Sequence, residues 1–531
     1  MKILIAEPLT EAGVQLLKAQ HGWEVVVSNP QEFSAHLGDA DVLIVGGGVM
    51  VDAAVLKKAP RLRLVGRAGV GADNVDLDAA TKAGVLVMNT PGGNAVSVAE
   101  HTLALMLAMA RSIPQAIAAT KRGDWGKQKF LGTELRGKTL GVIGLGSIGR
   151  EVVRRARGFE MRIVASDPYV NSRTAADLGT TLLSLDELYA ESDYITLHVA
   201  LTTETMGMLN QRAFARMKKG VRIVNCARGE LIDGEALCKA IESGKAAGAA
   251  LDVFQTEPPV GEPLLEFENV LATPHIGGST EEAQEAVGVR IAEQVRDYLR
   301  DGIALNAVNV PAMTAEQYRT VQPYAALAER LGTFAAHVAT GNPKLVRLAY
   351  HGKIAGQNTL LIRNAGLAGV LSRSVARKAN VVNAVQIAAD RGLAFAERHE
   401  KTSRPGQADS VRLELETDAG TTTVEGSLVL DRPRLLRVDG ISCEAPLSGH
   451  LIFLKNTDVP GVIGYVGSVT GKNKINIASF SLGREENRGV STSPLQAIAV
   501  VETDEPVPEI VLQQLLENPA VTAARPVEFR E

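Results

Sequence analysis

Three ionisable residues in the middle of the chain, Arg228, Glu257 and His275, each follow a short apolar segment. Such segments predict buried strands of a parallel sheet. Ligands of such sheets bind in a crevice outside the carboxyl ends of the strands. We therefore expect the three side chains to face one crevice.

These residue types suit hydride transfer from an alcohol that lies next to a carboxylate. Histidine has an unperturbed pKa of about 6.5, so it can take a hydroxyl proton at neutral pH. A neighbouring glutamate would stabilise the imidazolium, and a guanidinium would hold the carboxylate and polarise the adjacent oxygen. Taken singly, each residue has an ordinary interpretation: Arg228 as a surface ion pair, Glu257 as a turn acid before Pro258, and His275 as a loop histidine.

A glycine-rich turn upstream predicts the cofactor. Gly144-Leu-Gly-Ser-Ile-Gly149 follows the apolar run 138–143 and precedes a basic helical stretch. In such a fingerprint the first glycine permits the turn, the second lets the backbone approach a pyrophosphate, and the third lets helix pack on strand. Asp167 ends the next apolar run, about 20 residues on, where an acid binds the ribose and repels a 2′-phosphate. The pattern predicts NAD and not NADP.

The composition is that of a multidomain globular protein without an excess of basic residues. Of 531 residues, 45% are hydrophobic and 22% are charged, and the net charge is −4. This length predicts about three or four domains, and the charge does not favour nucleic acid or a membrane surface. The three cysteines lack CxxC spacing, so we expect neither disulfides nor a metal. An early acid argues against a signal peptide, and the apolar run 103–110 is too short to span a bilayer. We expect a cytoplasmic protein.

The order of elements predicts an α/β protein whose first domain is interrupted by the second. A helix over 95–111 leads into the fingerprint region, and a capped helix from Ser279 to about Arg300 returns the chain. We predict a flavodoxin-like substrate domain at 1–94 and 283–311, and a Rossmann-like NAD domain at 95–282. The expected strands are 3–6, 25–27, 42–45, 64–66 and 85–88, then 162–166, 194–199, 221–226, 249–253 and 270–272.

The rest of the chain predicts two further domains. In 312–446 we expect a helix at 324–338, a strand at 344–350, a helical region at 370–397, and strands at 410–416 and 421–430. In 447–531 the order strand, helix, strand, strand, helix, strand predicts a ferredoxin-like plait. Linkers are expected around 310–311 and 444–446.

Taken together, these motifs resemble those of the D-isomer-specific 2-hydroxyacid dehydrogenases, over the whole chain and in the long form of that family. The stretches that carry the resemblance are 66–76, 89–94, 144–149, 225–229 and 274–277. It implies that Arg228, Glu257 and His275 are catalytic. The implied substrate contacts are Val70, Gly71, Asn94, Arg228 and His275. The implied NAD contacts are Gly144, Gly146, Ser147, Ile148, Gly149, Asp167, Val199, Cys226, Ala227, Arg228, Asp252, His275, Gly277 and Gly278.

The resemblance also implies the reaction and its regulation. The implied reaction is NAD-dependent oxidation of D-3-phosphoglycerate to 3-phosphohydroxypyruvate, the first committed step of L-serine biosynthesis, in a homo-oligomer, dimer or tetramer. Residues 312–446 resemble an intervening, allosteric substrate-binding-like domain, and 447–531 an ACT regulatory domain. Asn456, Asp458 and Asn476 would bind L-serine at one edge of the plait, between two copies, with Asp458 taking the ammonium group. The alternative is a structural or dimerising plait without a ligand.

The chain departs from the family pattern in two places. Where relatives carry an Arg-Ser pair it has Val45-Gly-Gly-Gly-Val49, so a cation near the far end of the substrate is missing. Arg136, Lys127 and Lys129 are candidates for the phosphate, and each also fits a solvated surface charge. His198-Val-Ala200 replaces a Thr-Pro pattern in the wall of the NAD site. Two alternatives stay open: a dehydrogenase of another D-2-hydroxy acid, and an NAD-sensing binding protein.

Overall fold

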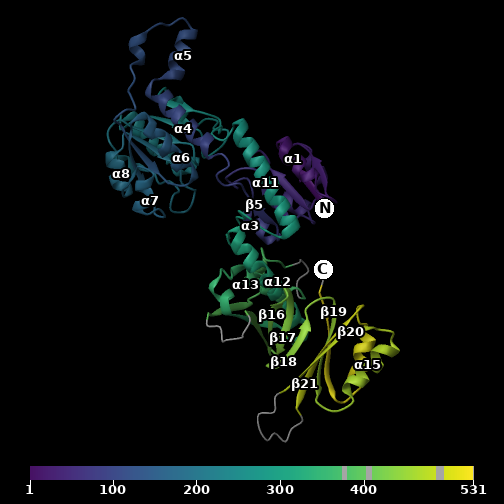
Figure 1. Ribbon diagram of the computed structural model, residues 1–531. Helices are drawn as coiled ribbons and strands as arrows, with labels where there is room; N and C mark the ends of the chain where they lie inside the picture. The colour runs from purple at the N-terminus through teal and green to yellow at the C-terminus, as the bar shows by residue number, and fades with distance from the viewer. Residues whose placement is uncertain (374–378, 402–408, 486–494, 530–531) are drawn as a thin grey trace. The chain divides into compact units, whose positions relative to one another are not determined.

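A computed structural model of the chain describes residues 1–373, 379–401, 409–485 and 495–529, which form four β-sheets with helices packed on them (Figure 1). The chain divides into two compact units. One comprises Met1–Pro8, Leu16–Asn89 and Ile291–Glu531, and the other comprises Leu9–Gln15 and Thr90–Arg290.

The first sheet is parallel and has the strand order β2-β1-β3-β4-β5, which is the flavodoxin-like order. Its sequence reads as nearly continuous apolar runs because both faces of a parallel sheet are covered, and all four residues of β3 are buried. The five predicted strands are present. They are β1 (Lys2–Ile5), β2 (Glu24–Val27), β3 (Val42–Val45), β4 (Leu64–Arg67) and β5 (Leu86–Met88). The helices of this region are α1 (Glu11–Lys18), η1 (Phe33–His36), α2 (Ala53–Lys58) and α3 (Leu77–Lys82).

The second sheet is also parallel and has seven strands in the order β12-β11-β10-β9-β6-β7-β8. Counted from β6, this is the Rossmann order with one further strand at the edge. The strand order reverses between β6 and β9, so the crevice of the fold opens there. The strands are β6 (Thr139–Ile143), β7 (Arg162–Ser166), β8 (Thr181–Leu182), β9 (Tyr194–Leu197), β10 (Val221–Asn225), β11 (Ala246–Leu251) and β12 (Val270–Ala272).

Helices accompany this sheet (Figure 1). They are α4 (Ala95–Ala110), α5 (Ile113–Lys121), η2 (Lys127–Phe130), α6 (Ser147–Ala156), η3 (Arg157–Phe159), α7 (Ser172–Asp177), α8 (Leu185–Glu191), α9 (Gln211–Arg216), η4 (Gly229–Leu231), α10 (Gly234–Glu242), η5 (Pro263–Glu266) and, leaving it, α11 (Glu281–Asp301). In the described part of the chain no single helix has the length and apolar composition to cross a bilayer; the bent pair α4 and α5 meets that criterion only when the two are joined.

The third sheet has the order β14-β13-β15-β16-β17-β18, with β13 and β14 parallel and the other pairs antiparallel. Its elements are α12 (Ala315–Val338), β13 (Pro343–His351), η6 (Gly352–Gly356), α13 (Leu360–Leu371), α14 (Ala384–Asp390), β14 (Ala394–Glu400), β15 (Ser410–Thr417), β16 (Gly420–Val429), β17 (Arg432–Val438) and β18 (Ile441–Pro446).

Two predictions fail in this region. The helical region expected at 370–397 ends in a strand, β14, because Gly392 with φ of 67° stops α14 and the next residues pair with β13; residues 374–378 of that region lie outside the described residues. The linker expected at 444–446 is the end of β18. Asp439 and Gly440 both have positive φ, 50° and 85°, which makes a type I′ turn between β17 and β18.

The fourth sheet is antiparallel, with the order β20-β21-β19-β22, and it confirms the ferredoxin-like plait. Its elements are β19 (His450–Thr457), α15 (Val462–Lys472), β20 (Ile477–Arg484), β21 (Gln496–Thr503), α16 (Glu509–Leu516) and β22 (Val521–Glu528). Successive residues of β19 alternate between two cores. Ile452 and Leu454 pack with α15 and α16, whereas Leu451 and Phe453 belong to the core of the third sheet.

Candidate active site

The glycine-rich turn after β6 has the geometry of a dinucleotide cradle. Gly144 has φ of 95°, and a Cβ there would lie 2.4 Å from the carbonyl oxygen of His198. A Cβ on Gly149 would lie 2.0 Å from the Gly144 oxygen, so both positions require glycine. Gly146 instead has open space around it. The turn is therefore closed on the protein side and open where a pyrophosphate would approach.

The start of α6 completes this cradle. Gly146 is its N-cap and gives no side-chain cap to the first turn, formed by Ser147, Ile148 and Gly149, so the backbone N–H groups there are available to an anion. Asp167 follows β7, and its carboxylate accepts hydrogen bonds from the N–H groups of Leu145 (2.7 Å) and Tyr169 (2.8 Å). These residues fit NAD, with Asp167 held beside the turn at the end of the adjacent strand.

The end of the adjacent strand, β9, carries a half-buried histidine that is uncharged at neutral pH. His198 follows β9, its Nε2 lies 2.9 Å from Thr196 Oγ1, and its Nδ1 is buried with no partner among the described residues. Burial lowers the pKa of His198 to about 3. Val199 beside it lies against the glycine turn, since its Cγ1 would be 2.8 Å from a Cβ on Gly144.

Cys226 follows β10 as a small core residue. Its thiol is buried, and this burial raises its pKa to about 12. A thiol that stays protonated is neither a nucleophile nor a good metal ligand. Ala227 is buried next to it.

His275 and Glu257 form a direct pair. The distance between His275 Nδ1 and Glu257 Oε2 is 2.8 Å, and the other carboxylate oxygen accepts from the N–H of Phe254 at 3.1 Å. The imidazole is 52% exposed and the carboxylate 38%. His275 has φ of 54°, a left-handed conformation that is rare for a residue with a side chain. Because Nδ1 faces Glu257, Nε2 is left for a substrate.

Arg228 lies on the loop that packs against the Glu257 turn. Asn225 shapes this loop, since its side chain accepts from the Ala227 N–H at 3.0 Å and donates to the Arg228 carbonyl at 2.8 Å. A Cβ on Gly229 would lie 2.1 Å from the carbonyl carbon of Phe254. This close approach brings the loop carrying Arg228 to the turn carrying Glu257.

Asp252 and Asn94 complete the surroundings of His275. Asp252 is 1% exposed; burial acts to raise the pKa of its carboxyl, but hydrogen bonds from His101, Thr273 and the N–H groups of Ile276 and Gly277 outweigh burial and lower it. Asn94 lies against Gly278, where a Cβ would be 2.8 Å from its Nδ2. Its Oδ1 is buried without a partner among the described residues, which leaves an acceptor for a ligand.

The glycine run in place of the Arg-Ser pair is organised by a carboxylate. Glu7 accepts from the N–H groups of Gly46 (2.9 Å), Gly48 (3.1 Å) and Val49 (2.8 Å). Asn74 donates to the carbonyls of Gly46 and Val49 at 2.9 and 2.7 Å. Since these N–H groups already bind Glu7, the run does not offer them to a phosphate.

Sequence reasoning missed Arg67, which brings a cation to this run. Its Nη2 would lie 3.4 Å from a Cβ on Gly47, and a Cβ on Gly69 would overlap its guanidinium. Arg67 ends β4 in the same compact unit as Val70 and Gly71. The motif that opens with Gly66-Arg67 contained the signal, but its arginine was not considered as a partner for the phosphate.

The three cations named from the sequence for the phosphate behave as surface charges. Arg136 pairs with Glu160 at 2.9 Å and is 73% exposed. Lys129 pairs with Asp124 at 2.8 Å and is 66% exposed. Lys127 is exposed in the same short helix, η2.

The plait does not bring the three expected effector residues together within one chain. Ala497 near the start of β21 pairs with Asn456 of β19 on one side and with Arg484 of β20 on the other. The Nε of Arg484 lies 3.5 Å from Asp458 Oδ1. Asn476 lies at the other end of β21, where its Nδ2 donates to Asp504 at 2.7 Å. The expectation that all three lie at one edge is therefore wrong for a single chain, because β20 runs the full length of β21 between the two places.

Comparisons with known proteins agree with this architecture. Residues 103–277 match the NAD binding domain of the D-isomer specific 2-hydroxyacid dehydrogenases, and residues 320–439 match the D-3-phosphoglycerate dehydrogenase intervening domain. The D-3-phosphoglycerate dehydrogenase of Methanocaldococcus jannaschii is 42% identical over 98% of both chains, and that of Bacillus subtilis is 36% identical over 99% of both. The structure of D-lactate dehydrogenase from Aquifex aeolicus with NAD and lactic acid matches 59% of this chain and all of its own, with 30% identity and a TM-score of 0.52.

Proposed function

We propose that the chain oxidises D-3-phosphoglycerate to 3-phosphohydroxypyruvate with NAD. It belongs to the D-isomer specific 2-hydroxyacid dehydrogenase family. The observation that carries the proposal is the pair formed by His275 and Glu257, 2.8 Å apart and on the same sheet edge as the glycine cradle. The relatives' names supply the substrate, and the geometry supplies a base for its hydroxyl group.

The side chains divide the work of the oxidation. His275 Nε2 takes the proton of the C2 hydroxyl. Glu257 stabilises the imidazolium that results. Arg228 holds the C1 carboxylate and polarises the C2 oxygen as it becomes a carbonyl, and Asn94 adds a hydrogen bond. NAD, when bound, supplies the acceptor for the hydride that leaves C2. Gly144 to Gly149 and Asp167 hold that cofactor.

Arg67 is our candidate for the substrate phosphate, with Val70 and Gly71 contributing backbone contacts. The neighbouring N–H groups are taken by Glu7, so a side-chain cation has to supply the charge. A guanidinium binds phosphate through two parallel hydrogen bonds. This assignment replaces Arg136, Lys127 and Lys129, of which Arg136 and Lys129 sit in exposed ion pairs.

An NADH absorbance assay over three acids tests the substrate. Wild type should prefer D-3-phosphoglycerate to D-glycerate and D-lactate. Arg67→Ala should raise KM for D-3-phosphoglycerate roughly tenfold or more, since hydrogen bonds to charged groups contribute about 1.5–3 kcal/mol, while the values for D-glycerate change little. Arg136→Ala is the matched control and should leave both unchanged. Equal use of D-lactate would favour the dehydrogenase of another D-2-hydroxy acid, and tight NAD binding without turnover of any acid would favour an NAD-sensing protein.

The same proposal covers assembly and regulation. Trp125 is 73% exposed and Leu131 is 93% exposed at the end of the α5 and η2 segment, and we propose that a second copy covers them in a homo-oligomer. Asn456 and Asp458 of one plait and Asn476 of another would then form an L-serine site between copies. Sedimentation of wild type and Trp125→Ser tests the proposed homo-oligomer. An equal molecular mass for the two proteins in solution would refute the proposal that a second copy covers Trp125.

The remaining assignments rest on the same kinship. We propose the substrate domain at 1–94 and 283–311, the NAD domain at 95–282, the intervening domain at 312–446 and the ACT domain at 447–531. We also propose the cytoplasm as the location.

A further inference from the structure

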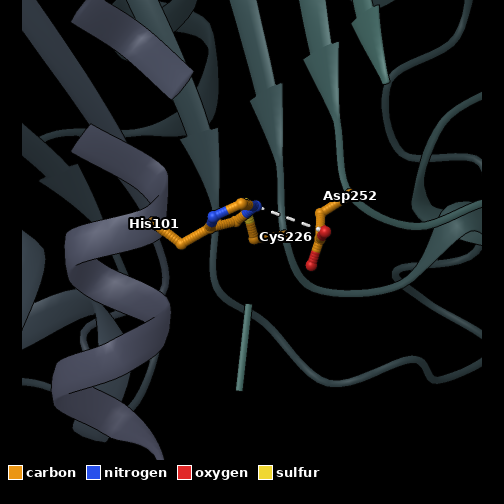
Figure 2. A group of neighbouring side chains, drawn as sticks. All are labelled: His101, Cys226 and Asp252. Atoms are coloured by element: carbon orange, nitrogen blue, oxygen red, sulfur yellow. Dashed lines mark ion pairs between the residues drawn. The ribbon is translucent and has the colours of Figure 1, made fainter. Parts of the chain in front are cut away.

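A cluster of side chains that the proposed mechanism does not use lies beside the loop of His275. His101 of α4, Cys226 after β10 and Asp252 after β11 have polar side-chain atoms within 4.8 Å of one another (Figure 2). His101 Nε2 lies 3.3 Å from Asp252 Oδ1 and 3.2 Å from Thr273 Oγ1. The imidazole of His101 is 17% exposed, and the Asp252 carboxylate is 1% exposed.

The donors in this cluster suit a hydrogen-bond network better than a metal ion. Burial raises the pKa of the Cys226 thiol to about 12, which keeps it protonated, whereas metals bind the thiolate. Both oxygens of Asp252 already accept hydrogen bonds, Oδ1 from the Thr273 hydroxyl and the Ile276 N–H, and Oδ2 from the Gly277 N–H. Because the carboxylate can only accept, His101 must carry its proton on Nε2 to interact with it.

This network holds the loop on both sides of His275. Asp252 binds Thr273 at 2.6 Å before the histidine, and Ile276 at 2.9 Å and Gly277 at 2.8 Å after it. His275 itself has φ of 54°, a conformation that persists only where surrounding contacts impose it. The direction of its side chain toward Glu257 therefore depends on the orientation of the Asp252 carboxylate.

We infer that His101 is a positioning residue for the base His275: by donating from Nε2 to Asp252 and Thr273, it fixes the carboxylate that holds the loop. The inference rests on the proposed function for its kinetic consequence, but its structural part concerns this chain alone. His101 contributes a donor from a long helix, α4, whose Ala99 and Thr102 are fully buried. A rigid helix thereby sets the position of a loop that would otherwise be held by loop residues only.

Three variants and one control test this assignment. His101→Ala removes the donor, His101→Asn carries an amide too short to reach Asp252, and His101→Gln places an amide N–H near the position of Nε2. Glu100→Ala is the control, since Glu100 is the neighbouring residue, is 63% exposed and pairs with Arg155. Steady-state kinetics give kcat and both KM values. Hydrogen–deuterium exchange of peptides covering 273–277 reports the loop without any turnover.

We expect His101→Ala and His101→Asn to lower kcat roughly ten- to hundredfold, which is the range of effects seen when a reacting group is misplaced. Both KM values should stay within about twofold of wild type, because this is the kinetic pattern of an interaction made only in the transition state. The Ile276 and Gly277 amides should exchange faster in these variants. His101→Gln should recover most of the loss, and Glu100→Ala should match wild type. Unchanged kcat and exchange in His101→Asn would overturn the inference, as would a His101→Gln variant as slow as His101→Asn. If wild type does not turn over D-3-phosphoglycerate, the proposed function fails, and the exchange data alone decide the role of His101.

Discussion

Replacing Glu257 by glutamine tests the central pair of the proposed site. The substitution keeps the size of the side chain and removes its charge, so that the imidazolium of His275 loses its counter-ion while the fold is retained. The distance of 2.8 Å between Glu257 Oε2 and His275 Nδ1 is that of a charge-assisted hydrogen bond. The pair therefore contributes to catalysis mainly when His275 carries the proton it has taken from the substrate.

The expected magnitude follows from the exposure of the pair. Hydrogen bonds to charged groups contribute about 1.5–3 kcal/mol. With the imidazole 52% and the carboxylate 38% exposed, water screens the charge, and the lower end of that range applies. A loss of about 1.4 kcal/mol is tenfold in rate, so Glu257→Gln should lower kcat roughly tenfold. His275→Ala removes the proton acceptor and should cost roughly 10²–10⁴.

NADH formation from D-3-phosphoglycerate measures both variants, and calorimetric titration with NAD provides the control. The NAD affinity of Glu257→Gln should stay within about twofold of wild type, because Glu257 is not among the expected NAD contacts. The reasoning would be refuted if Glu257→Gln retained full activity, or if His275→Ala turned over as fast as wild type.

Three further predictions concern the cofactor, acid stability and regulation. Asp167→Ala should weaken NAD binding and reduce discrimination against NADP, as measured by the two Kd values, because the ribose acceptor and its charge are lost together; a wild type that prefers NADP would contradict this. Burial lowers the pKa of His198 to about 3, from about 6.5 in the unfolded chain. Its contribution to the free energy of unfolding is therefore complete above about pH 6.5. As the pH falls from about 6.5 toward 3, that free energy decreases by about 1.4 kcal/mol per pH unit, because only the unfolded chain binds the proton. Urea unfolding at a series of pH values measures the free energy of unfolding. Between about pH 6.5 and 3 this free energy should fall less steeply with pH in His198→Gln than in wild type, and an equal dependence on pH would rule out the histidine as the cause. L-Serine should bind wild type in a calorimetric titration and bind Asp458→Ala more weakly; no heat from wild type, or equal binding by both, would exclude the proposed effector site.

The sequence was sufficient for the parallel sheets and for the cofactor turn. The strands of the first two sheets read as short apolar runs because both of their faces are covered, and the fully buried β3 is an example. Gly144 and Gly149 are required by local geometry, a positive φ and a close backbone approach, and local requirements leave a local pattern. The placement of Arg228, Glu257 and His275 after successive strands of one sheet followed from the same logic, although their roles remain predictions.

Only the tertiary structure showed those features that depend on contacts between residues distant in the sequence. The residues of β14 have a composition that favours a helix, but pairing with β13 makes them a strand. The glycine run at 46–48 looked like a missing cation site, whereas in the structure Glu7 accepts from the N–H groups of Gly46 and Gly48, and Arg67 lies beside Gly47. Asn476 was expected beside Asn456 and Asp458, yet it lies at the far end of β21. Such contacts join residues many positions apart, and no periodicity or spacing in the sequence encodes them, because they are set by how the sheets and loops pack and not by any local preference of the chain.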